Sequence, residues 1–133
     1  MKKHKILYIL SVCVIIAGIL SFLSPGKKPF KDLEAWEIES ATVRLLPPDK
    51  TVQIMEPREL VDYLKDVVIY NRDDSFNEYS GQAVIFTIQK TDGTQVEIME
   101  YNPFIVIDGI GYKCKYDPCE ALNNYANSLL NGK

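Results

Sequence analysis

The segment from Gly81 to Tyr116 constrains this chain more than any other, because it is almost entirely strand-forming. Turn signals interrupt it at Asp92-Gly93, Asn102-Pro103 and Asp108-Gly109. Short runs of β-branched and aromatic residues separated by such turns are typical of consecutive antiparallel strands. We therefore predict a β-meander here, onto which the rest of the folded chain packs.

The two Asp-Gly turns predict the strand registers. A three-residue loop, Thr91–Gly93, keeps the apolar side chains of the flanking strands on one face, whereas a slip of one residue would turn them over. It also places Gly93 at the left-handed position that follows a type I turn. A two-residue loop suits Asp108-Gly109. The predicted cross-strand pairs are Ile88 with Val96, Phe86 with Ile98, Ile107 with Ile110, and Ile105 with Tyr112.

Earlier segments predict two strands and a helix. Leu33–Leu46 reads as a strand whose apolar parity changes near Glu39-Ser40, which indicates a bulge there or a separate short lead-in. Thr51–Met55 reads as a second strand. Pro57 suits the first position of a helix, and Arg58–Tyr70 follows with apolar residues at helical spacing.

The chain ends in a second predicted helix. Asp117 is the expected N-cap, Pro118 the first helical position and Glu120 the partner that completes a capping box. Gly132 follows its end. We thus expect one α+β domain with the order strand, strand, helix, four strands, helix, in which two helices pack on an antiparallel sheet. The expected core residues are Val43, Leu45, Val52, Ile54, Leu60, Leu64, Val67, Val84, Phe86, Ile88, Val96, Ile98, Ile105, Ile107, Tyr112, Leu122, Ala126 and Leu129.

The N-terminus has the pattern of a membrane anchor or signal sequence. Lys2, Lys3 and Lys5 precede Ile6–Leu23, an uncharged apolar run of 18 residues. As a helix the run spans about 27 Å, close to the thickness of a bilayer core. The interpretation that we favour is an uncleaved single-pass helix with its N-terminus inside and the C-terminal domain outside. A cleaved signal and a lipoprotein, with Cys13 as the acylated residue, stay open as alternatives.

This interpretation divides the chain into an anchor or signal sequence (1–26), a tether (27–32) and an extracytoplasmic domain (33–133). Removing residues 1–26 removes three lysines and no acid, which leaves 12 basic and 18 acidic residues and a net charge of −6. Binding to nucleic acid or to an anionic lipid surface through this part is therefore disfavoured. We expect contact with the membrane through residues 6–23 only.

The absence of imidazole from the exported part limits its chemistry. The single histidine, His4, lies in the basic leader. This excludes Ser-His or Cys-His nucleophile pairs and histidine-based zinc sites from the domain. An alternation of polar residues over Asn71–Asn77 is reminiscent of a calcium loop, but Phe76 and Gln82 stand where such a loop needs glycine and glutamate. We expect no cofactor and no metal.

Cys114 and Cys119 are the candidate disulfide. Cys114 is predicted on the inner face of the last strand and Cys119 in the first turn of the last helix, so both side chains should meet at the strand–helix junction. Outside the cell such a bridge can persist. Two buried thiols, or a redox pair activated by the helix N-terminus, are the alternatives.

Four short motifs carry a resemblance to known domains: Pro47-Pro48, Tyr79-Ser80-Gly81-Gln82, Asp108-Gly109 to Tyr112, and Cys119-Glu120-Ala121-Leu122. With the leader, they make the chain similar to small membrane-anchored or lipoprotein-type domains exported by Gram-positive bacteria. The resemblance implies the architecture but no active site.

One side of the meander is the candidate partner face. The predicted registers direct five large residues away from the inner face, and an apolar patch of this kind is covered by a helix or offered to a partner. The five are Ile85, Met99, Tyr101, Phe104 and Val106. We therefore expect a non-catalytic binding module for a protein or peptide. An inhibitor or immunity-type protein is one form of this. The rival class is a cell-wall glycan hydrolase that uses Glu97 and Glu100, although residues three apart on a strand face opposite sides.

Overall fold

Seven strands form one antiparallel sheet in the computed structural model, which describes residues 26–78 and 81–132. The strands are β1 (Ile38–Leu46), β2 (Lys50–Gln53), β3 (Ile69–Arg72), β4 (Ala83–Lys90), β5 (Gln95–Tyr101), β6 (Phe104–Ile107) and β7 (Ile110–Cys114). Two α-helices, α2 (Pro57–Lys65) and α3 (Tyr116–Leu130), and two 3-10 turns, η1 (Ala35–Glu37) and η2 (Ser75–Glu78), complete this part of the chain. The spatial order is β2-β1-β4-β5-β6-β7-β3. The α+β class with an antiparallel sheet and two helices is thus confirmed.

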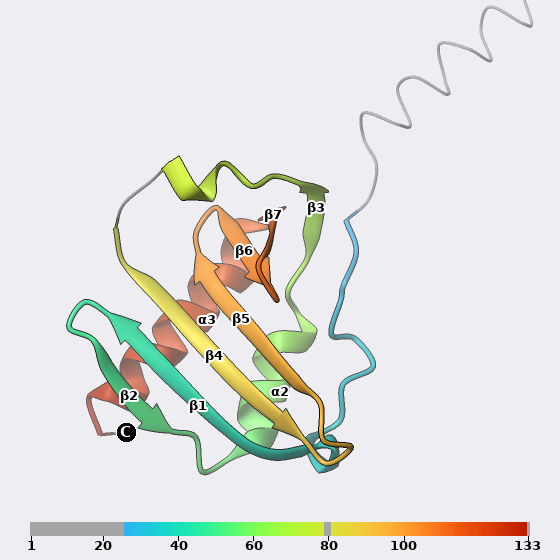
Figure 1. The fold of residues 1–133 in the computed structure, drawn as a ribbon, viewed down its shortest axis with the longest axis vertical. Helices are drawn as coiled ribbons and strands as arrows, with labels where there is room; N and C mark the ends of the chain where they lie inside the picture. Colours follow the sequence, from blue (N-terminus) through green and yellow to red (C-terminus); the bar gives the residue numbers. More distant parts are fainter. Residues whose placement is uncertain (1–25, 79–80, 133) are drawn as a thin grey trace, which may run out of the picture.

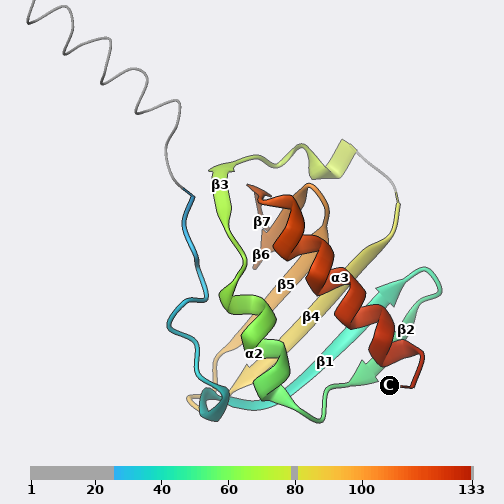
Figure 2. The same cartoon turned by 180° about the vertical axis from the view of Figure 1, so that it is seen from behind.

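Both helices lie on the same face of the sheet, as the opposed views of Figures 1 and 2 show. The inward side chains of β1, β4 and β5 form the core beneath them, with Val43, Phe86 and Ile98 fully buried. Tyr125 of α3 stacks on Tyr63 of α2, with ring centroids 4.7 Å apart, and joins the two helices. Of the core residues expected from the sequence, five are only half-buried: Val52, Val96, Ile107, Tyr112 and Leu129.

The registers predicted from the Asp-Gly turns are confirmed. Ile88 pairs with Val96 and Phe86 with Ile98, and the second hairpin pairs Ile107 with Ile110 and Ile105 with Tyr112. Gly93 and Gly109 have φ values of 89° and 85°, the left-handed conformation that these turns require. Local turn chemistry and the strand period were sufficient to predict these pairings, because hairpin register is a short-range property.

The first predicted strand is shorter than expected at its N-terminal end. Ala35–Glu37 forms the turn η1, so the strand begins at Ile38, and the register with β4 shifts between Ile38 and Ser40. Both readings of the parity change, a bulge and a short lead-in, are therefore present. The second strand occupies Lys50–Gln53 rather than Thr51–Met55.

The predicted helix over Arg58–Tyr70 is wrong in its second half. Helix α2 ends at Lys65, and the chain then forms the strand β3 at Ile69–Arg72, which pairs with β7 at the edge of the sheet. The run Val67-Val68-Ile69 is β-branched throughout, which favours a strand over a helix. The observed order therefore has one strand more than the predicted one.

The final helix begins earlier than its sequence indicates. Helix α3 starts at Tyr116 with Lys115 at the N-cap, and no side chain caps it, so the predicted capping box of Asp117 and Glu120 is wrong. The N–H of Lys115 instead donates to the carbonyl of Val68 at 2.9 Å, which fixes the chain to the β3 side before the helix begins. Gly132 follows the helix with φ 79°, as expected.

The predicted tether is attached to the domain. Lys27 forms an antiparallel bridge with Ile69, with two backbone hydrogen bonds of 2.8 Å, and Gly26 packs against Val68 and Tyr70. Across residues 26–78 and 81–132, no helix has the length and apolar character needed to cross a bilayer. The predicted anchor, residues 6–23, lies outside the described residues.

Candidate functional site

The five residues of the candidate partner face lie together on the side of the sheet away from the helices. Ile85 pairs with Met99, Met99 with Val106, and Tyr101 with Phe104. Directly paired residues in antiparallel strands share a face. Since the alternate residues of β4 and β5 point into the helix-covered core, this set faces the other way. The structure therefore brings together the residues that the sequence predicted as one surface.

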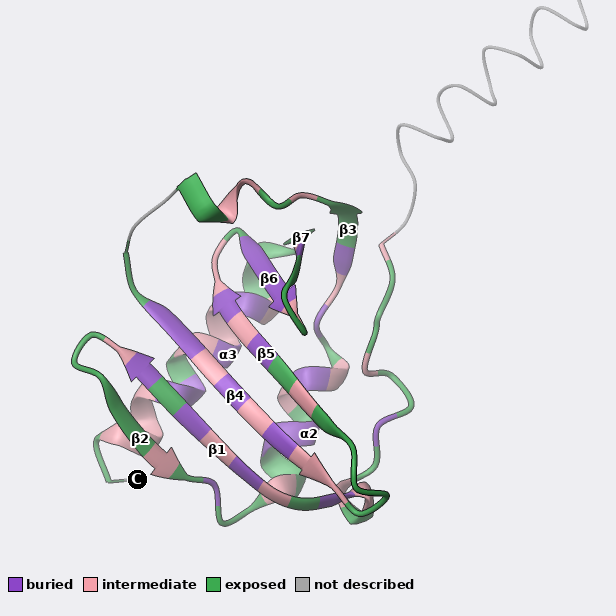
Figure 3. Ribbon diagram, viewed as in Figure 1, coloured by how far each residue is buried: buried purple, intermediate pink, exposed green. Residues whose placement is uncertain are grey.

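The candidate partner face is divided into a covered part and an open part. Phe104 and Val106, on β6, are only 3% and 5% exposed. Ile85, Met99 and Tyr101, on β4 and β5, are half-buried, and Figure 3 shows alternating burial classes along these strands. Neither helix covers this face. We call the half-buried trio, Ile85, Met99 and Tyr101, the open face.

The connection between β3 and β4 covers part of the β6–β7 hairpin. A Cβ built on Gly111 would lie 2.6 Å from the Phe76 ring and 2.5 Å from the Asp73 carbonyl oxygen, so the connection approaches β7 as closely as glycine allows. Gly111 pairs with Val106. The aromatic ring of Phe76 thus lies against β7 at the position that pairs with Val106, one strand away from β6, which carries the buried half of the candidate face.

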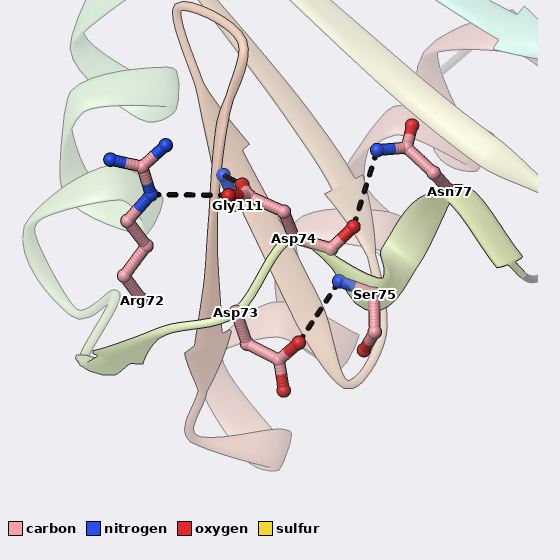
Figure 4. Close-up of polar contacts among 6 residues, drawn as sticks. All are labelled: Arg72, Asp73, Asp74, Ser75, Asn77 and Gly111. Atoms are coloured by element: carbon pink, nitrogen blue, oxygen red, sulfur yellow. Dashed lines mark hydrogen bonds and ion pairs between the residues drawn. The ribbon is translucent and has the colours of Figure 1, made fainter.

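Two carboxylates fasten this connection, as Figure 4 shows. Asp74 accepts hydrogen bonds from the N–H of Gly111 at 2.9 Å and from Arg72 at 3.1 Å. Asp73 accepts from the N–H of Ser75 at 2.9 Å, while its own N–H donates to the Gly111 carbonyl. These hydrogen bonds lower the pKa of both carboxyl groups below the ordinary value. The segment that resembled a calcium loop therefore uses its acids as structural acceptors, and the part of the chain that the structure describes holds no group of three metal-ligating side chains.

The surroundings of the open face are largely neutral. Threonine and glutamine side chains of β1, β4 and β5, namely Thr42, Thr87, Gln89 and Gln95, are half-buried or exposed beside it. Arg44 of β1 is already paired with Asp49, its Nε 2.7 Å from a carboxylate oxygen. A mixed surface of this composition suits contact with a polypeptide better than contact with a polyanion.

A polar cluster lies on the opposite, helix-covered side of the sheet. Glu100 of β5 is 3% exposed and accepts a hydrogen bond from the N–H of Asn102 at 2.9 Å. Burial raises the pKa of Glu100 to about 7, against the lowering effect of that hydrogen bond, and the charge of Glu120 adds to the rise. The side-chain amide nitrogen of Asn102 is buried and has no hydrogen-bond partner in the described chain.

The two candidate disulfide cysteines belong to this cluster. Cys114, at the end of β7, and Cys119, in α3, are both buried free thiols, and their side chains are in contact. This contact and burial raise the pKa of the Cys119 thiol, and the nearby charge of Glu100 raises it further. The predicted meeting of both sulfurs at the strand–helix junction is confirmed, whereas their oxidation to a disulfide stays a prediction.

Glu97 and Glu100 lie on opposite faces of β5. Glu97 is exposed and lies on the helix-free side, and Glu100 is buried under α3. Two carboxylates that act on one glycosidic bond must face the same cleft. The arrangement therefore does not bring together the pair that a glycan hydrolase would need.

Sequence reasoning missed two residues of these sites. The sequence predicts Asn102 only as part of a turn, although an Asn-Pro step beside a strand end is also a place where a polar side chain can turn inward. Phe76 stands in the sequence where a calcium loop needs glycine, which predicts no packing role for it. A phenylalanine in a largely polar loop is a signal that the loop packs against the rest of the domain.

Comparisons with protein-family models, with curated proteins and with solved structures found no match to this chain. The resemblance to exported Gram-positive domains therefore stays a prediction. What the fold itself defines is a class of arrangement: an α+β domain whose antiparallel sheet is covered by helices on one side only. The surfaces of this domain that can serve a function are accordingly the two faces of that sheet.

Proposed function

We propose that this chain is a non-catalytic module that binds a protein partner on the outer side of a membrane, to which residues 6–23 tether it. The observation that carries the proposal is the open face itself. Ile85, Met99 and Tyr101 form a continuous half-buried patch on the side of the sheet that neither α2 nor α3 covers. A contiguous apolar patch rimmed by polar residues is a feature of interaction surfaces.

The partner that fits this surface is a protein rather than a small ligand. The open face lies on a broad sheet, and its neighbours are short polar side chains such as Thr42 and Thr87. Flat surfaces with a central aromatic and aliphatic patch and a polar rim are typical of protein–protein contacts. An inhibitor or immunity-type role in the same envelope is one form that such binding can take.

The net charge of the exported part supports this choice. With 12 basic and 18 acidic residues outside the leader, the domain is repelled by nucleic acid and by anionic lipid headgroups. Glu97 is the charged residue of β5 on the helix-free side, and Arg44 is neutralised by Asp49. The separation of Glu97 from Glu100 gives no support to the rival hydrolase.

A charge placed in the open face tests the proposal. Met99→Lys should weaken partner binding by roughly tenfold or more, because a buried unpaired ammonium at an interface is strongly unfavourable. Met99 is half-buried, so the fold should tolerate the change, which circular dichroism checks. The measurement is crosslinking of the tagged full-length chain in its native membranes, followed by quantitative recovery of the linked protein.

The matched control is Asn124→Lys, which introduces the same charge at an exposed position of α3 on the other side of the sheet. The control should recover the partner as the wild type does. Equal recovery with both variants would place the binding surface elsewhere and refute the proposal. Phe104 and Val106 are poor probes, because their burial means that polar substitutions there would disturb the fold.

A further inference from the structure

Two strands, a turn and a helix bring a polar and thiol-containing cluster together under the helix layer. Strand β5 contributes Glu100, the turn after it Asn102, strand β7 Cys114 and helix α3 Cys119. Glu100 and Cys119 are 3% and 0% exposed, while Cys114 retains 8% of its surface. The open-face proposal uses none of these residues. Polar groups collected in a core cost stability unless something compensates, so this cluster requires an explanation.

The two thiols are placed for reaction with one another. Their side chains are in contact, and the Cys114 sulfur also lies 4.0 Å from the Asn102 side-chain oxygen. A cysteine whose thiol is buried and whose pKa is raised is a poor nucleophile until a base removes its proton. Cys119 is such a cysteine, so its reactivity depends on its neighbours.

Glu100 is the candidate for that base within the cluster. Asn102 connects it to the thiols, because the Asn102 N–H donates to Glu100 at 2.9 Å and the Asn102 side-chain oxygen lies 4.0 Å from the Cys114 sulfur. The charge of Glu100 also raises the pKa of the Cys119 thiol, and Glu120 of α3 is the further acid whose charge acts on Glu100. A carboxyl group that titrates near neutral pH is matched to take up and release a proton.

We propose that Cys114 and Cys119 form a redox-active dithiol that disulfide oxidants convert to a Cys114–Cys119 bridge, and that Glu100 is the proton acceptor for this step. The oxidant is a disulfide, R–S–S–R, of a small thiol or of an exported thiol oxidoreductase. The proposal stands independently of the open face. It makes the cluster a modification site that ties the end of β7 to the beginning of α3.

The reaction proceeds by two thiol–disulfide exchanges. The more exposed Cys114 loses its proton, and its sulfur attacks the oxidant, which forms a mixed disulfide and releases one R–S⁻. The Cys119 thiol then gives its proton to the Glu100 carboxylate, and the resulting thiolate attacks the Cys114 sulfur. The second R–S⁻ leaves. Each released thiolate takes up one of the two protons, so two protein thiols are oxidised and one disulfide is reduced to two molecules of R–SH.

The sequence allows a direct readout of this bridge. Lys113 and Lys115 flank Cys114, so trypsin releases the dipeptide Cys114-Lys115, which only a disulfide can hold to the peptide that carries Cys119. The full-length chain, with Cys13→Ala to remove the third thiol, is incubated folded with oxidised glutathione, alkylated and digested. We expect the linked peptide pair. Two alkylated cysteines, with oxidation only after unfolding in urea, would overturn the proposal.

The role of Glu100 is tested by the rate of bridge formation as a function of pH. In the wild type the rate should rise through the Glu100 pKa of about 7. In Glu100→Gln this rise should be lost and the rate should fall by about tenfold or more, as expected for removal of a positioned base. The control is Glu97→Gln, on the exposed side of the same strand, which should behave as the wild type does.

The direction in which Glu100→Gln changes the rate of bridge formation shows whether Glu100 acts as a base or only through its negative charge. A nearby negative charge disfavours the Cys119 thiolate, so if Glu100 acted only through its field, its removal would accelerate oxidation. A faster or unchanged Glu100→Gln variant therefore refutes the assignment. Should that variant fail to fold, the wild-type profile decides, since the absence of an inflection near pH 7 would refute it as well.

Discussion

Burial keeps the Glu100 carboxyl group neutral at pH values where an exposed glutamate is charged. In the unfolded chain this group ionises near its ordinary pKa of 4.5, and in the folded protein it stays protonated up to about 7. Between these values the folded state binds more protons than the unfolded state does. The contribution of Glu100 to stability therefore falls as the pH rises from about 4.5 to about 7, and it is constant on either side of that window.

Glu100→Gln should remove this pH dependence. The variant keeps a side chain of the same shape that can still accept the N–H of Asn102. At pH above 7, under reducing conditions, we expect it to be more stable than the wild type by up to about 3 kcal/mol. Urea denaturation at several pH values measures the effect, with Glu97→Gln as the exposed control. A wild type whose stability does not fall across the window would show that Glu100 ionises freely.

At the scale of single residues, the sequence predicted well to which face a side chain points, but it predicted poorly which other side chains lie around it. Strand parity placed Cys114 on the inner face and Glu100 on the side opposite Glu97, and the structure confirms both. Parity could not predict that the charges of Glu100 and Cys119, or of Glu100 and Glu120, influence one another, because this depends on how α3 packs over β5. The predicted start of α3 was also wrong, because the N-cap is Lys115 and not Asp117. The N–H of Lys115 donates to the carbonyl of Val68, a residue far away in the sequence.

At the scale of elements, the connection between β3 and β4 depends on Gly111. Gly111→Ala would set a methyl group 2.6 Å from the Phe76 ring and 2.5 Å from the Asp73 carbonyl oxygen. The connection would have to move away from β7. We expect a loss of about 1–3 kcal/mol in the free energy of unfolding, the usual range for overpacking a closed contact.

A double-mutant cycle with Phe76→Ala identifies the source of that cost. If the ring is a main obstacle, Gly111→Ala should cost measurably less in the Phe76→Ala background. Denaturant unfolding of the four chains gives the coupling energy. An alanine at position 111 without effect in either background would mean that the connection does not rest on β7.

The strand β3 shows where sequence patterns reach their limit. The apolar residues Val67-Val68-Ile69 continue the helical spacing of α2. No segment close to Ile69 in the sequence could pair with it as a strand. Its partners are Cys114, far along the chain, and Lys27, which precedes β1. Hairpin registers were predictable because both strands and their turn are contiguous. The edge strand β3 was not predictable, because the segments that pair with it are far from it in the sequence.

At the scale of the molecule, the sheet has two different faces and one protected edge. The helices bury one face, as Figures 1 and 2 show. On the other face Phe76 of the β3–β4 connection packs against Gly111, and Ile85, Met99 and Tyr101 form the open face. At the β3 edge, Lys27 occupies hydrogen-bonding groups of Ile69 that would otherwise be free for another strand. Protection of this kind limits edge-to-edge association. It leaves the open face as the surface through which we expect the domain to meet its partner.

The bridge between Lys27 and Ile69 also bears on the anchor. If residues 6–23 span a membrane, only a few residues separate the bilayer from a point fixed to the domain. The domain should then be held close to the membrane surface, while its net charge of −6 keeps it from adhering to anionic lipid. The attachment should therefore depend on the apolar run alone and be insensitive to salt.

Membrane extraction tests this attachment. We expect the native chain to stay in the membrane fraction after washes with high salt and with carbonate, and to be released by detergent, because burial of an apolar run of 18 residues is not an electrostatic interaction. N-terminal sequencing of the released protein should recover the leader. A mature chain that begins near Lys27 and is found in the soluble fraction would show instead that the leader is a cleaved signal. A lipid-modified chain that begins at Cys13 would identify a lipoprotein.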